Sequence, residues 1–274
     1  MSDRREFLKH CGILGGLFLV SQQEVVNSLS QFSRFNLKLD LNNLNLFFTG
    51  NLKGNLSELS QIKDTSSLLF DAGNFISSSS EIEHQIKKMN FLGYQVAALG
   101  KNELALGEEK LIQLAQKSEF ALVNSHINFE NKVLSKLVKP FQIIDLVEKK
   151  VGVLSISSGF KSSRDLKKIN ELANTMKNKQ NCGIVVCLIA NNIQKKTAHS
   201  LLRKSENIDL FWTPEIPNTK GGNFISRNAL AQEVTLIYGT KSKREIGYYQ
   251  ADLSNDYYLP KQIIHEVKTK QFIG

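Results

Sequence analysis

The sequence predicts an α/β fold, and three features of its hydrophobic pattern support that prediction. Short apolar runs of strand length alternate with segments whose apolar residues recur at helical spacing, over most of the chain. One run, 183–190, is apolar throughout, as in a strand buried on both faces. The last third changes to strand-like runs with little helix between them, so we expect antiparallel strands to complete the fold.

The expected elements follow one another closely along the chain. Strands are predicted where an apolar run is bounded by Gly, Asn or charged residues, and helices where apolar positions recur every three or four residues. The three charged residues 148–150 split two apolar runs and predict a hairpin. Strands are expected at 44–49, 67–72, 95–99, 120–124, 141–147, 151–156, 183–190, 208–212, 234–238, 246–253 and 262–267, and helices at 25–35, 81–92, 108–116, 165–179 and 193–203.

Composition is that of a globular domain with a basic excess. The chain has 274 residues, of which 41% are hydrophobic and 22% charged, and its formal net charge is +9. Lys and Arg are spread along the sequence, and no aromatic-basic motif of an RNA-binding sheet is present, so we expect no nucleic-acid partner. Cys182 and Cys187 flank an apolar run and are expected to be two core thiols rather than a disulfide.

The N-terminus has the pattern of an export signal. Arg4 and Arg5 are followed by Phe7-Leu8-Lys9 and then by an apolar stretch, 11–20, which at ten residues is too short to span a bilayer. This pattern resembles the twin-arginine signal, and it predicts export to the bacterial periplasm, with anchoring at the inner membrane if the segment stays uncleaved. We therefore expect a signal segment and lead-in over 1–30, a single domain over 31–274, and no other transmembrane span.

Several segments, taken in order, resemble one enzyme family. Residues 46–54 (Leu-Phe-Phe-Thr-Gly-Asn-Leu-Lys-Gly) are similar to an opening strand followed by Thr-Asn-Asp-x-His-Gly, and 69–74 (Leu-Phe-Asp-Ala-Gly-Asn) to a strand with a Gly-Asp turn. Residues 89–107 run through Asn-Phe-Leu-Gly-Tyr and end in Leu-Gly-Lys-Asn-Glu-Leu-Ala-Leu-Gly, close to Asn-x-Leu-Gly-Tyr and Leu-Gly-Asn-His-Glu-Phe-Asp-x-Gly. The hairpin begins with Lys139-Pro140-Phe141, similar to a Pro-Tyr-x-Ile motif.

Together these segments resemble the N-terminal catalytic domain of the 5'-nucleotidase branch of the calcineurin-like metallophosphoesterases. The resemblance covers about residues 44–255. It implies a four-layer α/β/β/α sandwich with a two-metal, phosphate-cleaving site at the carboxyl ends of the strands. The family's enzymes often carry a second, C-terminal domain that holds the nucleotide base, so a separate chain of that type, or another periplasmic protein, is an expected partner.

The resemblance places different residues where the family has its metal ligands. Asn51 and Lys53 stand at the Asp and His of the first turn, and Asn74 stands at the bridging Asp of the second. Lys101 and Asn102 stand at the Asn and His of the third turn, where Glu103 matches the family's Glu. After the next two strands the matching positions are Asn191 and Glu215, and Glu215 is the only replacement with an anionic oxygen.

These substitutions predict a site without the family's metal pair. Two divalent ions about 3.5–4 Å apart need anionic or imidazole ligands. An amide oxygen is neutral, and a protonated Lys donates hydrogen bonds and repels a cation. The five histidines, at 10, 84, 126, 199 and 265, fall on none of the expected positions. We therefore expect no metal and no other cofactor, with structural turn roles for Asn51 and Asn74 and a capping role for Glu103.

Three functions remain open from the sequence. The first is an exported, catalytically degenerate 5'-nucleotidase-like protein that acts as a binding partner. The second is an active metal-dependent phosphoesterase with ligands rearranged around Glu103, Glu215 and His126. The third is a phosphate- or anion-binding module, in which the ammonium groups of Lys53 and Lys101 replace the charge of the metals.

Overall fold

The computed structural model describes one compact unit of the chain. The described residues are 43–54, 67–146, 149–160, 164–190, 193–239, 245–252 and 261–266, and all of them lie within the unit 39–274. The expected signal segment and the helix at 25–35 lie outside this part of the chain. The division into a lead-in over 1–30 and one domain over 31–274 therefore stays a prediction.

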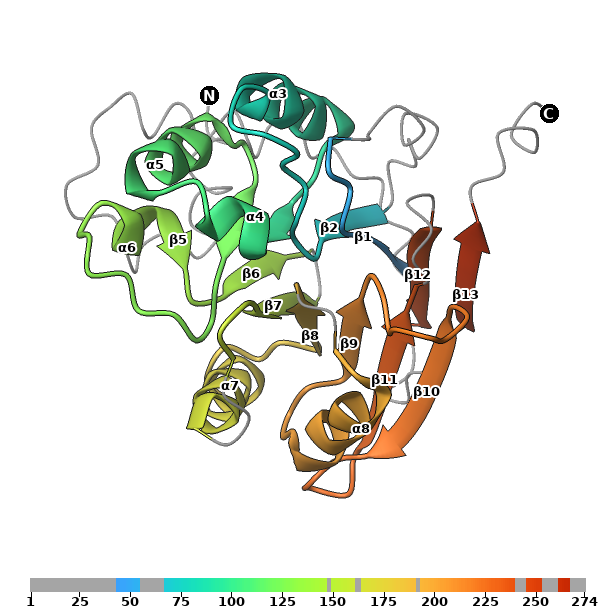
Figure 1. Ribbon diagram of the computed structural model, residues 1–274. Coiled ribbons are helices and arrows are strands. Elements are labelled where there is room, and N and C mark those ends of the chain that lie inside the picture. Colours follow the sequence, from blue (N-terminus) through green and yellow to red (C-terminus); the bar gives the residue numbers. More distant parts are fainter. Residues whose placement is uncertain are drawn as a thin grey trace, which may run out of the picture. The chain divides into compact units, whose positions relative to one another are not determined.

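The first sheet has seven strands in the order β13-β12-β1-β2-β3-β4-β5 (Figure 1). Its strands β1 to β5 run parallel, β12 pairs antiparallel with β1, and β13 pairs antiparallel with β12. The bounds are β1 Asn43–Thr49, β2 Ser67–Asp71, β3 Val96–Ala98, β4 Ala121–Val123, β5 Val138–Lys139, β12 Glu245–Asp252 and β13 Lys261–Glu266.

The second sheet has six strands in the order β10-β11-β9-β8-β7-β6. Its centre is parallel, from β7 through β8 and β9 to β11, and the two edge strands β6 and β10 are antiparallel to their neighbours. The bounds are β6 Gln142–Asp145, β7 Lys150–Ile156, β8 Ile184–Ile189, β9 Leu210–Thr213, β10 Gly222–Arg227 and β11 Glu233–Tyr238.

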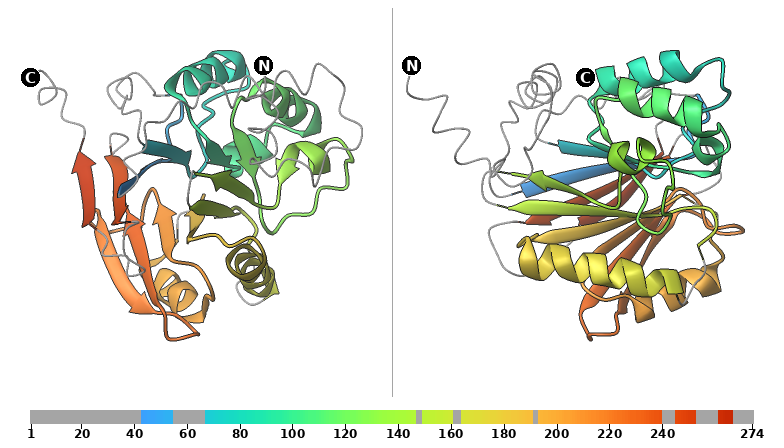
Figure 2. Two further views of the ribbon diagram at one scale, coloured as in Figure 1. Left: turned by 180° about the vertical axis from the view of Figure 1, so that it is seen from behind. Right: turned by 90° about the vertical axis from the view of Figure 1, so that its left-hand side faces the viewer.

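Helices cover the outer faces of the two sheets and make four layers (Figures 1 and 2). The first sheet carries α3 (Ile82–Leu92), α5 (Glu108–Lys117) and α6 (Leu134–Leu137), and the single turn α4 (Lys101–Leu104) follows β3. The second sheet carries α7 (Arg164–Asn174), which continues as the π-helical turn η3 (Thr175–Lys179), and α8 (Lys195–Lys204). Each long helix buries an apolar stripe, such as Ile82, Ile86 and Met89 of α3, in the core below it.

Trp212 of β9 joins the two sheets. Its side chain is 1% exposed, and its indole Nε1 donates a hydrogen bond to the Thr49 carbonyl oxygen of β1 at 3.0 Å. The indole stacks on Phe48 of β1 with ring centroids 5.7 Å apart. On β12, a Cβ added to Gly247 would come within 2.3 Å of the indole, so only glycine leaves room for this contact between the sheets.

The structure confirms the predicted fold class, the four-layer sandwich, and most of the predicted elements. Three short elements, β5, α4 and α6, were not predicted. Strand β10 was also missed, since its alternating half-buried and exposed positions include Gly, Asn and Ser and give little contrast in hydropathy. Of the strands predicted to close the fold, β12 and β13 are antiparallel to their neighbours, whereas β11 pairs antiparallel with β10 and parallel with β9.

Candidate functional site

The loops that follow β1, β2 and β3 meet at the carboxyl ends of these strands. The backbone N–H of Asn51 donates to the Gly73 carbonyl at 2.9 Å, and that of Lys53 donates to the Asn74 carbonyl at 3.1 Å. Three non-glycine residues in these turns, Asn51, Lys53 and Asn74, adopt positive φ (55°, 45° and 57°). The predicted turn roles of the two asparagines are therefore observed, since Asn adopts this conformation more readily than most residues.

The side-chain amide of Asn74 ties four segments together. Its Nδ2 donates to Asn51 Oδ1 at 3.0 Å and to the Ala190 carbonyl at the end of β8 at 2.9 Å. Its Oδ1 accepts from the backbone N–H of Asn102 at 3.1 Å. The Ala190 carbonyl can only accept and the Asn102 N–H can only donate, so these partners fix the orientation of the amide. The network is neutral, and it includes the residue for which the sequence resemblance predicts the position of the bridging carboxylate.

Glu103 lies beneath this network and has no exposed surface. Its Oε2 accepts hydrogen bonds from the backbone N–H groups of Asn74 and Gly100, both at 2.8 Å, and its Oε1 accepts from Ile76 at 2.9 Å. Burial raises the pKa of the Glu103 carboxyl, and the three backbone donors oppose that rise. Glu103 thus has the capping role expected from the sequence, and its oxygens point at backbone groups.

The glycines at the turns allow this close packing. A Cβ on Gly100 would lie 2.5 Å from the backbone nitrogen of Asn74, and a Cβ on Gly73, where φ is +93°, would lie 2.7 Å from that of Gly100. The loops after β2 and β3 are therefore in direct backbone contact, which fixes the position of Asn74 between them.

A second buried acid, Asp71, lies at the end of β2. Its Oδ2 accepts from the Thr49 hydroxyl and its Oδ1 from the Gly73 N–H, both at 2.6 Å, while Tyr94 shares a 2.8 Å hydrogen bond with the Thr49 hydroxyl. Desolvation is the main cause that raises the pKa of Asp71, from 3.8 to about 7, and the charge of Glu103 adds to it. The partners of Asp71 in the described residues are thus a hydroxyl and a backbone N–H rather than a base.

On the side of the second sheet, the residues after β9 bring few polar groups to these loops. Pro214 follows β9 and occupies the space beside Gly50, where an added Cβ would lie 2.6 Å from the proline Cγ. Glu215 is half-buried, and the only hydrogen bond recorded for it among the described residues uses its backbone carbonyl, which accepts from the Thr213 hydroxyl at 3.3 Å. Asn191, the remaining predicted site position, lies outside the described residues.

Lys53 and Lys101 are exposed at the rim of the loops around Asn74. Their segments adjoin through Asn74. The backbone N–H of Lys53 donates to the Asn74 carbonyl, and the backbone N–H of Asn102, which follows Lys101, donates to Asn74 Oδ1. Asn102 also donates through its own Nδ2 to the Ile76 carbonyl at 2.9 Å. Every amide of this cluster thus has a hydrogen-bond partner, and the two cations remain at the solvent side.

The described histidines lie away from this cluster. His126, after β4, packs edge-on against Phe160 with both ring nitrogens buried, and desolvation is the largest cause that lowers its pKa. His199 of α8 stacks on Phe224 of β10 with centroids 3.9 Å apart, and His84 is exposed on α3. Across the described ranges, no three His, Cys, Asp or Glu side chains are grouped closely enough to hold a metal ion.

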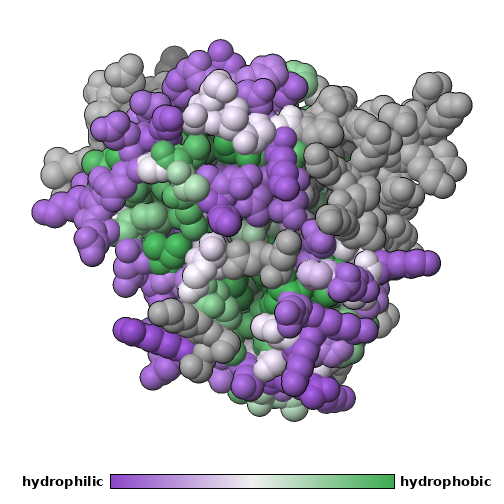
Figure 3. All heavy atoms as spheres, viewed as in Figure 1, coloured by the Kyte–Doolittle hydropathy of each residue, from purple (hydrophilic) through white to green (hydrophobic). Residues whose placement is uncertain are grey.

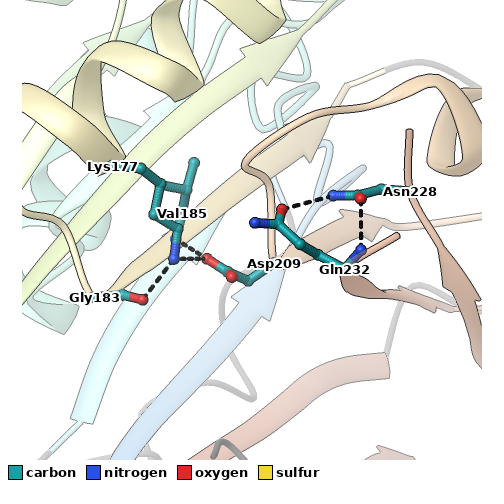
Figure 4. Close-up of polar contacts among 6 residues, drawn as sticks. All are labelled: Lys177, Gly183, Val185, Asp209, Asn228 and Gln232. Atoms are coloured by element: carbon teal, nitrogen blue, oxygen red, sulfur yellow. Dashed lines mark hydrogen bonds and ion pairs between the residues drawn. The ribbon is translucent and has the colours of Figure 1, made fainter. Parts of the chain in front are cut away.

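Asp209 pairs with a base at the other end of the second sheet (Figure 4). Its Oδ2 accepts from the Val185 N–H at 2.6 Å and forms an ion pair with Lys177 Nζ at 2.7 Å. Lys177 also donates to the Gly183 carbonyl at 2.7 Å. This ion pair lies at the amino ends of β8 and β9, away from the candidate site.

The two described cysteines are part of the core of the second sheet. Cys182 and Cys187 are both buried and free, as predicted. Burial raises the pKa of each thiol, which keeps both sulfurs protonated near neutral pH. Neither thiol contributes to the loops around Asn74.

Comparison with known proteins identifies the class of fold. No protein-family model and no curated protein sequence matches the chain. Its structure is similar to a 5'-nucleotidase precursor from Thermus thermophilus, with a TM-score of 0.67 and 13% identity over 81% of this chain and 54% of that one. It is also similar to the NAD nucleotidase NadN of Haemophilus influenzae, with a TM-score of 0.65 and 15% identity over 82% and 50% of the two chains.

A third similar structure is shorter. The calcineurin-like phosphoesterase YfkN from Bacillus subtilis aligns with a TM-score of 0.60 and 14% identity, over 82% of this chain and 91% of that one. This chain spans about half the length of the two nucleotidases named above. At such low identity the likeness establishes the fold. The chain has the metallophosphoesterase fold, in the form seen in 5'-nucleotidases and calcineurin-like phosphoesterases.

Proposed function

We propose that this chain is an exported, catalytically degenerate member of the 5'-nucleotidase-like metallophosphoesterases and acts as a binding protein. The observation that supports the proposal is the hydrogen-bonded amide of Asn74, the residue that the sequence resemblance aligns with the family's bridging carboxylate. A carboxylate there would place an anionic oxygen against Asn51 Oδ1 and the Ala190 carbonyl in the present arrangement. Both the nitrogen and the oxygen of the neutral Asn74 amide have hydrogen-bond partners.

The described donor set does not fit a pair of divalent ions. Asn51 and Asn74 offer neutral oxygens that are already bonded to each other's donors or to backbone groups. The buried oxygens of Glu103 are bonded to backbone N–H groups, and the rim carries the cations of Lys53 and Lys101. Bringing a dication to this rim would cost Coulomb repulsion and would break several hydrogen bonds.

The test is metal content and turnover measured on the same preparation. We expect no stoichiometric Mn, Fe or Zn after expression with all three available, and no hydrolysis of nucleoside monophosphates or of phosphodiesters. An active metallophosphoesterase carried through the same purification is the positive control. About two metals per chain, or turnover that follows the protein through purification, would favour the active phosphoesterase. Glu215→Ala should then abolish metal binding, because Glu215 is the one carboxylate at the replaced ligand positions.

The anion-binding module is a second candidate, favoured by the two exposed lysines. Lys53 and Lys101 lie beside loops that both bond Asn74, so a phosphate at the rim could meet both ammonium groups. We expect inorganic phosphate to raise the melting temperature of the wild type and not that of Lys53→Glu/Lys101→Glu. The matched control is Lys87→Glu/Lys110→Glu, on α3 and α5, which changes the net charge equally. Equal protection of both variants would exclude this function.

Export and partnership are part of the proposal. The export component rests on Arg4 and Arg5 and the apolar stretch after them, and Arg4→Lys/Arg5→Lys should retain the protein in the cytoplasm. Among the described residues, no helix has the length and apolarity needed to cross a membrane. As partner we propose a separate chain of the nucleotidase C-terminal type or another periplasmic protein. Co-purification of such a chain with the tagged protein from the periplasmic fraction, lost on competition with untagged protein, is the test.

A further inference from the structure

The two helical layers differ in charge. Residues 82–137, which contain α3 to α6, hold seven Lys and Arg residues against six Asp and Glu. Residues 164–204, which contain α7, η3 and α8, hold nine Lys and Arg residues against two acidic ones. A net charge of +7, out of +9 for the whole chain, is therefore carried by the segment that forms one outer layer. The net positive charge is therefore concentrated in one segment of the sequence and in one helical layer.

Most of these cations have no anionic partner in the described residues. Lys177 is paired with Asp209, and Lys168 Nζ donates to Asn128 Oδ1 at 2.7 Å. The other seven are exposed, and no ion pair between described residues engages them. We call these seven the α7–α8 face: Arg164, Lys167, Lys179, Lys195, Lys196, Arg203 and Lys204.

Between the two helices lies a hollow of about 530 Å³. Its lining includes the apolar side chains of Leu166, Ile193 and Leu201, with Lys167 contributed by α7 and Lys204 by α8. Figure 3 shows hydrophobic atoms in this region of the surface with hydrophilic side chains on both sides. Glu171 and Glu206 also line the hollow, so the positive charge of the layer comes mainly from the exposed positions around it.

The side chains of the α7–α8 face restrict the class of partner that it can bind. None of the large hydrophobic side chains exposed in the described residues belongs to α7, η3 or α8. Phe91 and Val133 lie in the first helical layer, Ile225 lies on β10, and Leu230 lies in the loop that bonds Ser205 at the end of α8. The two helices themselves therefore present no exposed aromatic platform for single-strand nucleic acid and no large exposed apolar anchor for a protein. What remains is a broad layer of separate positive charges over two helices, which is complementary to a broad negative surface.

We propose that the α7–α8 face binds the surface of a bilayer that contains anionic phospholipid. The contact is electrostatic, with lysines and arginines near the lipid phosphates and no insertion of a helix into the hydrocarbon. Because each basic residue near an anionic surface strengthens binding by about fivefold, seven of them suffice for reversible attachment. The attachment is independent of the loops around Asn74, so it holds or fails separately from the proposed function.

The experiment is co-sedimentation of the full chain with vesicles. One set contains phosphatidylcholine alone, and the other contains equal parts of phosphatidylcholine and phosphatidylglycerol. The test variant is Lys167→Glu/Lys196→Glu/Lys204→Glu, and the matched control is Lys87→Glu/Lys110→Glu/Lys136→Glu on the opposite helical layer. Both variants change the net charge by the same amount and keep residues 1–42, so any contribution of that segment is constant. All six lysines are exposed, and melting curves check that each variant folds.

We expect binding to the mixed vesicles and little to phosphatidylcholine alone. The test variant should lose more than about 100-fold in affinity, the control about tenfold or less, and binding should weaken steeply with salt. Equal losses in the two variants would reduce the effect to net charge and overturn the proposal. Binding to both vesicle types alike would also overturn it. So would binding to neither, which would point instead to an acidic protein as the complement of this face.

Discussion

The two sheets contribute unequally to the loops at the carboxyl ends of their strands. The first sheet supplies Asn51, Asn74 and Asn102, whose side chains bond one another or neighbouring backbone, with Glu103 buried beneath them. The second sheet supplies only the Ala190 carbonyl and the ring of Pro214 among the described residues. On the side of the first sheet, hydrogen-bonded amides line these loops. On the side of the second sheet, the ring of Pro214 packs against the loop after β1. Among the described residues, the polar side-chain network at these strand ends is thus confined to the loops of the first sheet.

The second sheet has a partly buried ion pair at its other end. Asp209, before β9, bonds the Val185 N–H and Lys177, at the amino ends of the strands. Polar anchoring thus lies at the carboxyl ends in the first sheet and at the amino ends in the second. Four measurements test this contrast, and we give them in order of decreasing magnitude.

Removing the buried acid of the first sheet should have the largest effect. Glu103→Ala leaves three backbone N–H groups, of Asn74, Ile76 and Gly100, without an acceptor. We expect a loss of about 4–6 kcal/mol in the free energy of unfolding, measured by urea denaturation. Glu215→Ala, on the side of the second sheet, should change it by about 0.5 kcal/mol or less. Similar losses for both residues would contradict the contrast between the sheets.

The buried acids should also make stability depend on pH. Asp71 has a pKa of about 7 in the folded protein against 3.8 when unfolded, so between these values the unfolded chain releases a proton that the folded protein keeps. The contribution of Asp71 to the free energy of unfolding is therefore fully present below about pH 4. It is lost as pH rises to about 7, by up to about 4 kcal/mol. Glu103, whose pKa is also raised, acts in the same direction.

The comparison of wild type with Asp71→Asn isolates this effect. Urea denaturation at pH 5 and pH 8 should show that the difference in stability between the two pH values shrinks in the variant, because the neutral amide does not titrate. An unchanged difference would mean that Asp71 is ionised in the folded protein, and that its hydrogen bonds from Thr49 and Gly73 outweigh its burial.

The amide network makes an asymmetric prediction for its two asparagines. Asn74 uses both its nitrogen and its oxygen, so Asn74→Asp sets a carboxylate oxygen against two acceptors and should cost about 2–3 kcal/mol. Asn51 accepts through its oxygen in that network, so Asn51→Asp should cost about 1 kcal/mol or less. Chemical denaturation at pH 8 compares them. A larger loss for Asn51→Asp would show that the network is oriented the other way.

The ion pair of the second sheet should give the smallest effect. Lys177 and Asp209 side chains are 21% and 29% exposed, so a double-mutant cycle with Lys177→Met and Asp209→Asn should give a coupling of about 1 kcal/mol. The pair Lys150–Asp145, at 3.3 Å and 42% and 51% exposed, is the control and should couple by about 0.5 kcal/mol or less. Equal coupling in the two pairs would show that partial burial adds nothing here.

The sequence predicts the frame better than the network inside it. The strands and helices could be predicted because their buried positions are apolar. This holds for the whole of β8 and for the buried stripes of α3 and α5. Motif order located Asn51, Asn74 and Glu103. It could not show that Asn74 reaches the Ala190 carbonyl, 116 residues away, since a backbone acceptor has no signature in sequence. The hydrogen bond between Asp71 and Thr49 could not be read from the sequence for a similar reason, because the two residues lie on neighbouring strands.

The fluorescence of Trp212 can report on the contact between the two sheets. Trp212 is the single tryptophan of the chain, and it sits against Phe48 and Gly247 with its indole bonded to Thr49. Any event that moves the two sheets apart must expose this indole to water, whereas a change confined to the helical layers leaves it covered. Its intrinsic fluorescence therefore reads the docking of one sheet on the other, in the native protein and without a label.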